Sequence, residues 1–276
     1  MLDFLRKKTR STGSVLFRGA IPPRLENFYF LKDVGVELTP ESAGEESVWA
    51  ARARHPQWGE AMLICPRQFQ APSRPLLEFD PRLTKAEVES ILACGSGVTM
   101  GMIHEQQNVL RERKLALRML HAIMGQDGLA IADHASQRFW SPAAAAEEVA
   151  HDADLDIESL YSLHAVSANK EKNAPTQWLH SHGLAELGYF DFDILQPSPD
   201  VFPSGILRAL AYGIVEDRIE ANSNDIELAQ PQGPIRMVPA DTFRRRAAAR
   251  FANLRDGPDG DHSANRSVVC DPIKWP

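Results

Sequence analysis

Between residues 84 and 150, segments with the hydrophobic periodicity of a helix alternate irregularly with segments that have the periodicity of a strand. This order constrains the fold more than any other feature of the sequence. Thr84 and Glu87 have the spacing of a capping box, which starts a helix, and Ser141 followed by proline starts another. Strand-like and helical runs follow one another over residues 97–103, 105–124, 129–132 and 142–150. This order predicts an α+β fold with a mostly antiparallel or mixed sheet and helices packed on one face, or else two fused α/β halves.

The same patterns predict further elements on either side of this region. Strand-like runs cover residues 61–65, 76–79, 160–167, 176–180, 189–194, 235–238 and 267–270, and helical runs cover 204–221 and 241–254. The first 60 residues and residues 256–266 are less regular, because prolines or turn-forming residues interrupt them. We predict one α+β domain over residues 1–276, with a subdivision near residues 125–155 as the alternative.

The charge balance of the chain narrows the classes of partner. The formal net charge is -7 and the pI is about 5.7. Nucleic acids and anionic membranes are bound through clustered Lys and Arg, so neither is predicted as a partner. Charged runs are predicted to face water, and they include residues 111–114 in the helix predicted over 105–124.

The apolar runs and the cysteines indicate a cellular location. No run of signal-peptide length follows the basic N-terminal residues, and none approaches the roughly 18 apolar residues of a membrane helix. Cys65, Cys94 and Cys270 lie far apart, which predicts buried free thiols and neither a disulfide framework nor a CxxC metal site. We therefore expect a cytoplasmic protein.

The segment from Gln177 to Leu184 holds the residues best suited to chemistry. His180 and His182 stand two positions apart, and in an extended strand such residues project to the same side, as two metal ligands must. Asp193, or Asp191, could add an oxygen ligand from the next predicted strand and leave one position open for water. Such a site would lower the pKa of the water and generate a hydroxide nucleophile.

The spacing of His180, His182 and Asp193 resembles the zinc signature of the JAMM deubiquitinase-type metalloproteases. In that signature His-x-His is followed by seven residues, a serine, two further residues and an aspartate. The chain departs from it at Phe190, which replaces the serine, and at Gly183, which replaces the proline after the second histidine. The resemblance implies a metal-dependent hydrolase, although no general-base glutamate can be identified.

A second resemblance covers roughly residues 115–193. The segments that carry it are Leu120-His121-Ala122, residues 129–133, residues 160–166, and residues 178–184 continuing to Gly188. In order and spacing they resemble an uncharacterised bacterial domain-of-unknown-function family with LYxxH and WxHTHGL segments, where Ser181 stands for the threonine. The resemblance implies membership without an activity. It adds His164 as a neighbour of the histidine pair, if the strands over 160–167 and 176–180 pair.

Three interpretations of the histidine segment remain open. In the structural one, Trp178 packs into the core, and Ser181 or His182 caps the short helix that follows. In the leading functional one, the protein is not an enzyme, has no cofactor or catalytic residue, and binds a protein partner or small ligand near His164, Trp178, His180 and His182. In the alternative, a divalent metal held by His180, His182 and Asp193 serves a hydrolase.

Overall fold

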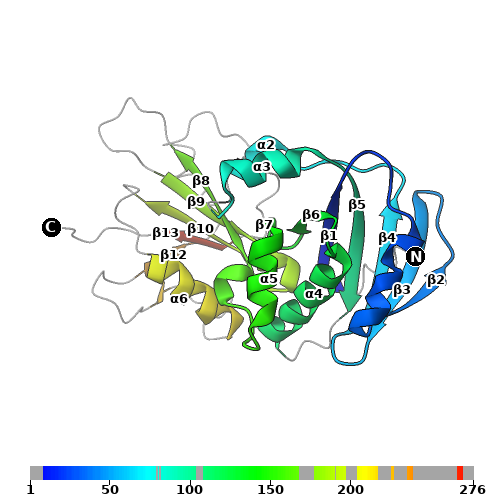
Figure 1. The fold of residues 1–276 in the computed structure, drawn as a ribbon. Helices are drawn as coiled ribbons and strands as arrows, with labels where there is room; N and C mark the ends of the chain where they lie inside the picture. The colour runs from blue at the N-terminus through cyan, green and yellow to red at the C-terminus, as the bar shows by residue number, and fades with distance from the viewer. Residues whose placement is uncertain are drawn as a thin grey trace. The chain divides into compact units, whose positions relative to one another are not determined.

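The computed structural model describes residues 9–78, 80, 82–103, 108–167, 177–189, 191–196, 204–216, 225–226, 235–238 and 266–269. The chain divides into two compact units, Met1–Leu160 and Tyr161–Pro276, each with its own sheet (Figure 1). None of the described helices is both long enough and apolar enough to cross a membrane. The helix predicted over 241–254 and almost all of the segment 256–266 lie outside the described residues.

The first unit is built on a seven-stranded sheet in which every neighbouring pair is antiparallel. Its strands are β1 (Thr9–Arg18), β2 (Glu37–Glu41), β3 (Ser47–His55), β4 (Gly59–Pro66), β5 (Cys94–Ile103), β6 (Gly128–Asp133) and β7 (Arg138–Trp140). Their spatial order is β2-β3-β4-β5-β1-β6-β7. The first 60 residues, despite their irregular pattern, thus supply three strands of this sheet, and β1 lies in its interior.

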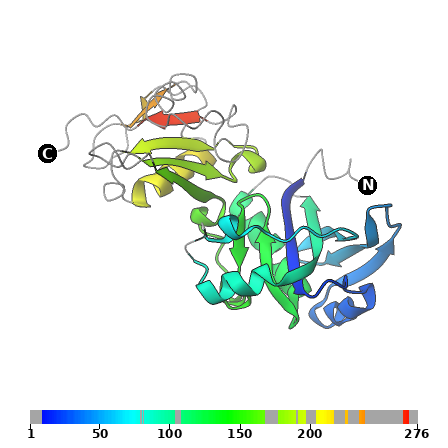
Figure 2. The same ribbon diagram turned by 90° about the horizontal axis from the view of Figure 1, so that it is seen from above.

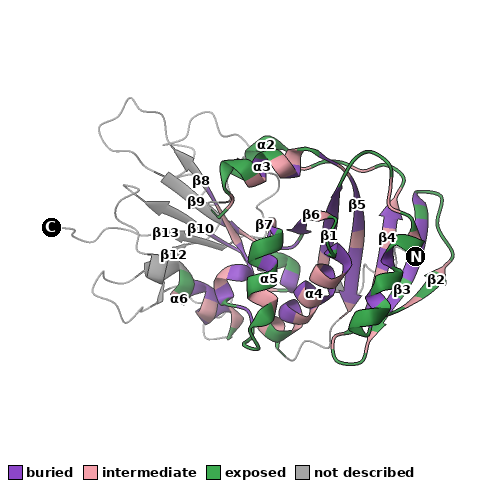
Figure 3. Cartoon of the chain, in the orientation of Figure 1, coloured by how far each residue is buried: buried purple, intermediate pink, exposed green. Residues whose placement is uncertain are grey.

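Helices cover both faces of this sheet. They are η1 (Leu25–Val34), α2 (Arg74–Glu78), α3 (Lys85–Leu92), α4 (Val109–Met124), α5 (Pro142–Ala150) and η2 (Ile157–Ser159). Successive strand residues point to opposite faces, and α4 and α5 share a core with Val15, whereas α2 and α3 pack around Leu16. Much of β1 and β5 is buried between these helices (Figure 3). The predicted α+β class with a mostly antiparallel sheet is confirmed. Helices α4 and α5 pack on one face of the sheet, as expected. The short helices α2 and α3 pack on the other face, which the prediction did not include.

Local signals located the two capped helices correctly. The Thr84 hydroxyl accepts a bond from the Glu87 amide at 3.3 Å, while the Glu87 carboxylate accepts one from the Thr84 amide at 2.7 Å. Ser141 likewise caps α5. The strand predicted over residues 76–79 is wrong, since these residues belong largely to α2 with Leu77 buried. A short apolar run fits a helical turn as well as a strand, so its periodicity does not separate the two.

The charged run in α4 also differs from its prediction. Arg113 and Lys114 are 5% and 2% exposed, although the whole run was expected to face water. Arg113 forms an ion pair with Asp133 of β6, and the Lys114 ammonium lies 2.7 Å from the Glu148 carboxylate of α5. Charged residues tolerate burial when they are paired, and the partners lie in other elements, so the helix sequence alone could not predict this burial.

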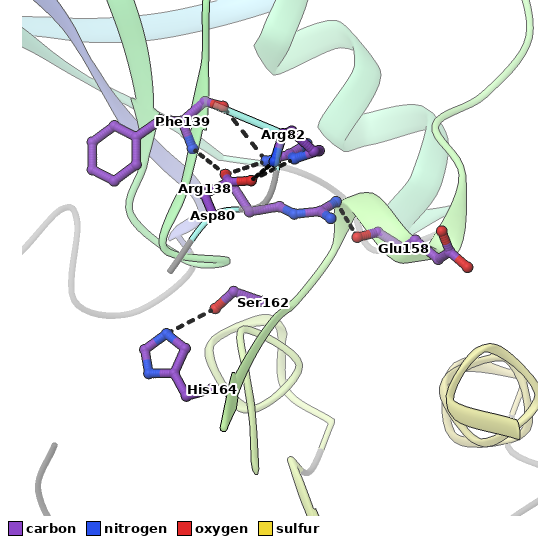
Figure 4. Close-up of polar contacts among 7 residues, drawn as sticks. All are labelled: Asp80, Arg82, Arg138, Phe139, Glu158, Ser162 and His164. Carbon is purple, nitrogen blue, oxygen red and sulfur yellow. Dashed lines mark hydrogen bonds and ion pairs between the residues drawn. The ribbon is translucent and has the colours of Figure 1, made fainter. Parts of the chain in front are cut away.

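A polar contact ties the segment before α3 to β7 (Figure 4). The Arg82 guanidinium donates to the Asp80 carboxylate at 2.7 Å and 2.9 Å, and its carbon lies 5.1 Å from the centre of the Trp140 ring. The Phe139 amide donates to the same carboxylate at 3.4 Å. Asp80 thereby links the short helices on one face of the sheet to its last strand.

We expect the Cys65 thiol to be unreactive in the folded protein. Cys65 is fully buried and free, and burial raises the pKa of its thiol to about 11. The thiolate is the reactive form, and a thiol with this pKa is almost fully protonated at neutral pH. Iodoacetamide at neutral pH should leave the Cys65 peptide unmodified in native protein and alkylate it in urea, as peptide mass spectrometry would show. Equal alkylation in both states would contradict this expectation.

The second unit contains a six-stranded mixed sheet (Figure 2). Its strands are β8 (Ser162–Ser167), β9 (Gln177–His182), β10 (Phe192–Gln196), β11 (Asp225–Ile226), β12 (Ile235–Val238) and β13 (Arg266–Val269), in the spatial order β11-β12-β13-β10-β9-β8. Only the β10–β13 pair among them is parallel. The described part of this unit also contains the helices η3 (Ala185–Leu187) and α6 (Ser204–Val215). The strand expected to begin at Tyr189 begins at Phe192.

Candidate functional site

The register of β8, β9 and β10 brings three of the predicted site positions into one cross-strand row. His164 of β8 lies opposite His180 of β9, which in turn lies opposite Asp193 of β10. Directly opposed residues project to the same face of a sheet, with Cβ atoms about 4.5–5.5 Å apart. Ser162 and His182 are also opposite each other and occupy the same face, two positions along. We call these five positions the histidine face.

Two of the predicted side chains are in direct contact. The rings of His164 and His182 have centroids 4.5 Å apart and planes inclined by 56°. His164 is 5% exposed, and its Nε2 lies 3.4 Å from the Ser162 hydroxyl (Figure 4). The structure thus places His164, which belongs to the preceding strand β8, against His182, the second histidine of the predicted pair.

The other predicted site residues are described by their backbone alone. Trp178, His180 and Asp193 occupy register positions in β9 and β10, and their side chains lie outside the described part of the structure. Among the side chains that are described, no three of His, Cys, Asp or Glu lie close enough together to hold a metal ion. The histidine face therefore combines two imidazoles in contact with two further strand positions, those of His180 and Asp193, which are set by register.

The connection from β9 to β10 is closed by the carboxylate of Asp191. This carboxylate accepts hydrogen bonds from three successive amides, those of Gly183, Leu184 and Ala185, at 3.1–3.3 Å. It also accepts one from the Ser181 hydroxyl at 2.8 Å, and that hydroxyl accepts one from the Phe192 amide at 2.9 Å. We call this network the Asp191 clamp.

The clamp corrects one interpretation of the sequence. Ser181 or His182 was expected to cap the short helix after β9, but Asp191 reaches back to cap it. Gly183 has φ of 129°, a conformation that favours glycine, as the turn interpretation requires. Burial raises the pKa of the Asp191 carboxyl, and the hydrogen bonds that it accepts oppose this rise. Both carboxylate oxygens of Asp191 are engaged in the clamp. Asp193 is therefore the better candidate of the two for a metal ligand.

A polar cluster that sequence reasoning missed lies in the first unit. The Ser14 hydroxyl of β1 is 2.9 Å from His134 Nε2 and 3.0 Å from the Thr99 hydroxyl of β5. A serine next to an imidazole is part of a nucleophile–base arrangement, which also requires a group that orients the imidazole. The carboxylate of Asp133, adjacent in sequence, is bound instead by Arg113 and by the amides of residues 135 and 136. This cluster is therefore the weaker candidate site.

Comparisons with known proteins add no relative, since no family model, curated protein or solved structure matches this chain. The resemblances to the JAMM signature and to the bacterial family of unknown function accordingly stay predictions.

Proposed function

We propose that the second unit binds a small ligand at the histidine face, and that this ligand is a divalent transition metal ion such as zinc. The observation that carries the proposal is the cross-strand register, which aligns His164, His180 and Asp193 in one row. Imidazole and carboxylate are suitable ligands for Zn²⁺. The contact between the rings of His164 and His182 supports the same assignment, because two imidazoles that share an ion must approach closely.

The number of donors favours binding over hydrolysis. The sequence alone suggested two histidines and one aspartate, a set that leaves an open position for a reacting water. The register adds His164 as a fourth donor, and four protein ligands complete the tetrahedral shell that is typical of a closed zinc site. A role in binding a metal without catalysis is therefore the better supported function, with a metal-dependent hydrolase as the alternative.

The chemistry of the chain also supports a location and a class of partner. Cys65 and Cys94 are free thiols, as is usual in a reducing compartment, and this supports a cytoplasmic location. The net charge of -7 favours a cation over nucleic acid. A protein partner that recognises the metal-loaded face is compatible with this function.

Zinc binding by protein without a histidine tag tests the proposal. We expect one zinc ion per chain in a competition titration with a chromophoric chelator. The variants His164→Ala, His182→Ala, His180→Ala and Asp193→Ala should each weaken binding by more than about 100-fold, beyond the 10–100-fold typical of residues outside the ligand shell. The control is His151→Ala, which removes an exposed histidine of the first unit and should leave the affinity unchanged.

Two outcomes of this titration would reject the proposal. One is the absence of stoichiometric binding by the parent protein, and the other is an unchanged affinity in all four variants. The hydrolase alternative would gain support if zinc-loaded protein cleaved peptide or ester substrates with an apparent pKa near 7, about the value for zinc-bound water, and if His182→Ala removed that activity.

A further inference from the structure

The Asp191 clamp surrounds His182 along the chain. The residue before it, Ser181, donates its hydroxyl to Asp191 Oδ1 at 2.8 Å, and the residue after it, Gly183, donates its amide to Oδ2 at 3.3 Å. The Phe192 amide, at the start of β10, donates to the Ser181 hydroxyl at 2.9 Å. The backbone on both sides of His182 is therefore held to the chain that enters β10.

The clamp is shielded from water. Ser181 is 0% exposed, and Asp191 is 4% exposed. A buried carboxylate is stable only when donors satisfy it, and here a hydroxyl and three amides do so. An asparagine at this position would place an NH₂ group, which cannot accept, where a carboxylate oxygen now accepts. The network is consequently specific to a carboxylate.

His182 is the last residue of β9, and the Asp191 clamp holds the residues on either side of it. Strand pairing holds His182 only at the end of β9, where its register partner is Ser162, the first residue of β8. Beyond His182 the chain turns through Gly183, and the first three amides of this turn donate to Asp191. The ring of His182 nevertheless lies against that of His164, at 4.5 Å between centroids. Fixing the backbone on both sides of a strand-end residue restricts the directions that its side chain can take.

We propose that Asp191 and Ser181 are positioning residues that hold His182 in the geometry in which it binds a metal together with His164. For its ligand this inference rests on the proposed function, but it concerns residues that do not touch the ion. The network outside a metal site commonly orients the ligands, and its loss typically weakens metal binding by about 10–100-fold. A cap that only stabilised the turn would lower stability without changing the affinity of the folded protein.

Three variants separate positioning from stability. Ser181→Ala removes the hydroxyl that joins Asp191 to Phe192, Ser181→Thr keeps it, and Asp191→Asn keeps the size of the side chain. We expect Ser181→Ala and Asp191→Asn to weaken zinc binding by roughly 10–100-fold, and Ser181→Thr to retain the parent affinity. The matched control is Ser141→Ala, which removes the side-chain cap of α5 in the first unit and should lower stability alone.

A second measurement makes the test independent of zinc. In metal-free protein, nuclear Overhauser effects between the imidazole protons of His164 and His182 report the approach of the two rings. They should be present in the parent and in Ser181→Thr, and weak or absent in Ser181→Ala. If the parent binds no zinc while these effects follow the expected pattern, the proposed function fails and the positioning role stands.

The inference is overturned if folded Ser181→Ala keeps the parent effects between the two rings, and equally if it keeps the parent zinc affinity. Circular dichroism and thermal unfolding would establish that the variant is folded. Should Asp191→Asn not fold, Ser181→Ala decides, because removing one hydroxyl leaves the amide bonds to Asp191 in place.

Discussion

Replacing Asp133 by alanine is expected to destabilise the first unit by about 3–5 kcal/mol, the range typical of removing one partner of a buried ion pair. Asp133 pairs with Arg113 at side-chain exposures of 10% and 5%, and it also accepts bonds from the amides of Ala135 and Ser136. The alanine would leave a guanidinium buried without its carboxylate and two amides without their acceptor. Urea unfolding, followed by hydrogen exchange in peptides from α4 and β6, would measure the loss.

The control for this variant lies on the same helix. Arg118 of α4 is 3.2 Å from Asp152, whose side chain is fully exposed, so Asp152→Ala should produce no measurable change. Similar losses in Asp133→Ala and Asp152→Ala would show that burial of the Arg113 pair does not matter for stability. If the alanine variant is not soluble, Asp133→Asn tests the same carboxylate with its shape retained.

Replacing Phe192 by alanine is expected to destabilise the second unit by about 3–5 kcal/mol, as for other buried phenylalanines. Phe192 is 0% exposed, and its ring meets that of Tyr161 in an edge-on contact with centroids 5.8 Å apart. The alanine removes the ring and leaves a cavity, while the backbone amide of residue 192 can still bond to Ser181. Faster amide exchange in peptides from β8, β9 and β10 would report the effect.

An exposed aromatic residue supplies the comparison for Phe192. Tyr29 of η1 is 59% exposed, so Tyr29→Ala should leave the stability of the protein close to that of the parent. A loss in Phe192→Ala no larger than that in Tyr29→Ala would mean that the buried ring contributes little to the core of the second unit.

The fold class and the positions of several elements could be predicted because their signals are local. The capping box of α3 joins groups only three residues apart, and the serine–proline start of α5 is equally local. Hydrophobic periodicity located β5, β6 and β9 to within a few residues. It failed for residues 76–79, where one buried leucine, Leu77, could belong to a strand or a helical turn.

The candidate site was predictable only in part, for the same physical reason. Two histidines two positions apart in one strand share a face whatever the rest of the fold, so the pair at positions 180 and 182 is predictable from the sequence. The place of His164 depended on strand pairing, which is set by long-range contacts. The carboxylate of Asp191 was considered as a ligand, but its hydrogen bonds show that it closes the turn instead.

The sequence by itself determined the α+β class, the helix starts at Thr84 and Ser141, and the shared face of the histidine pair, because each follows from residues that are neighbours in the chain. Only the tertiary structure decided that β1 lies inside its sheet and that Arg113 and Lys114 are buried. Their partners stand 20 and 34 positions away, respectively. A charge is stable in the interior only beside its partner, and the packing of separate elements brings the two together.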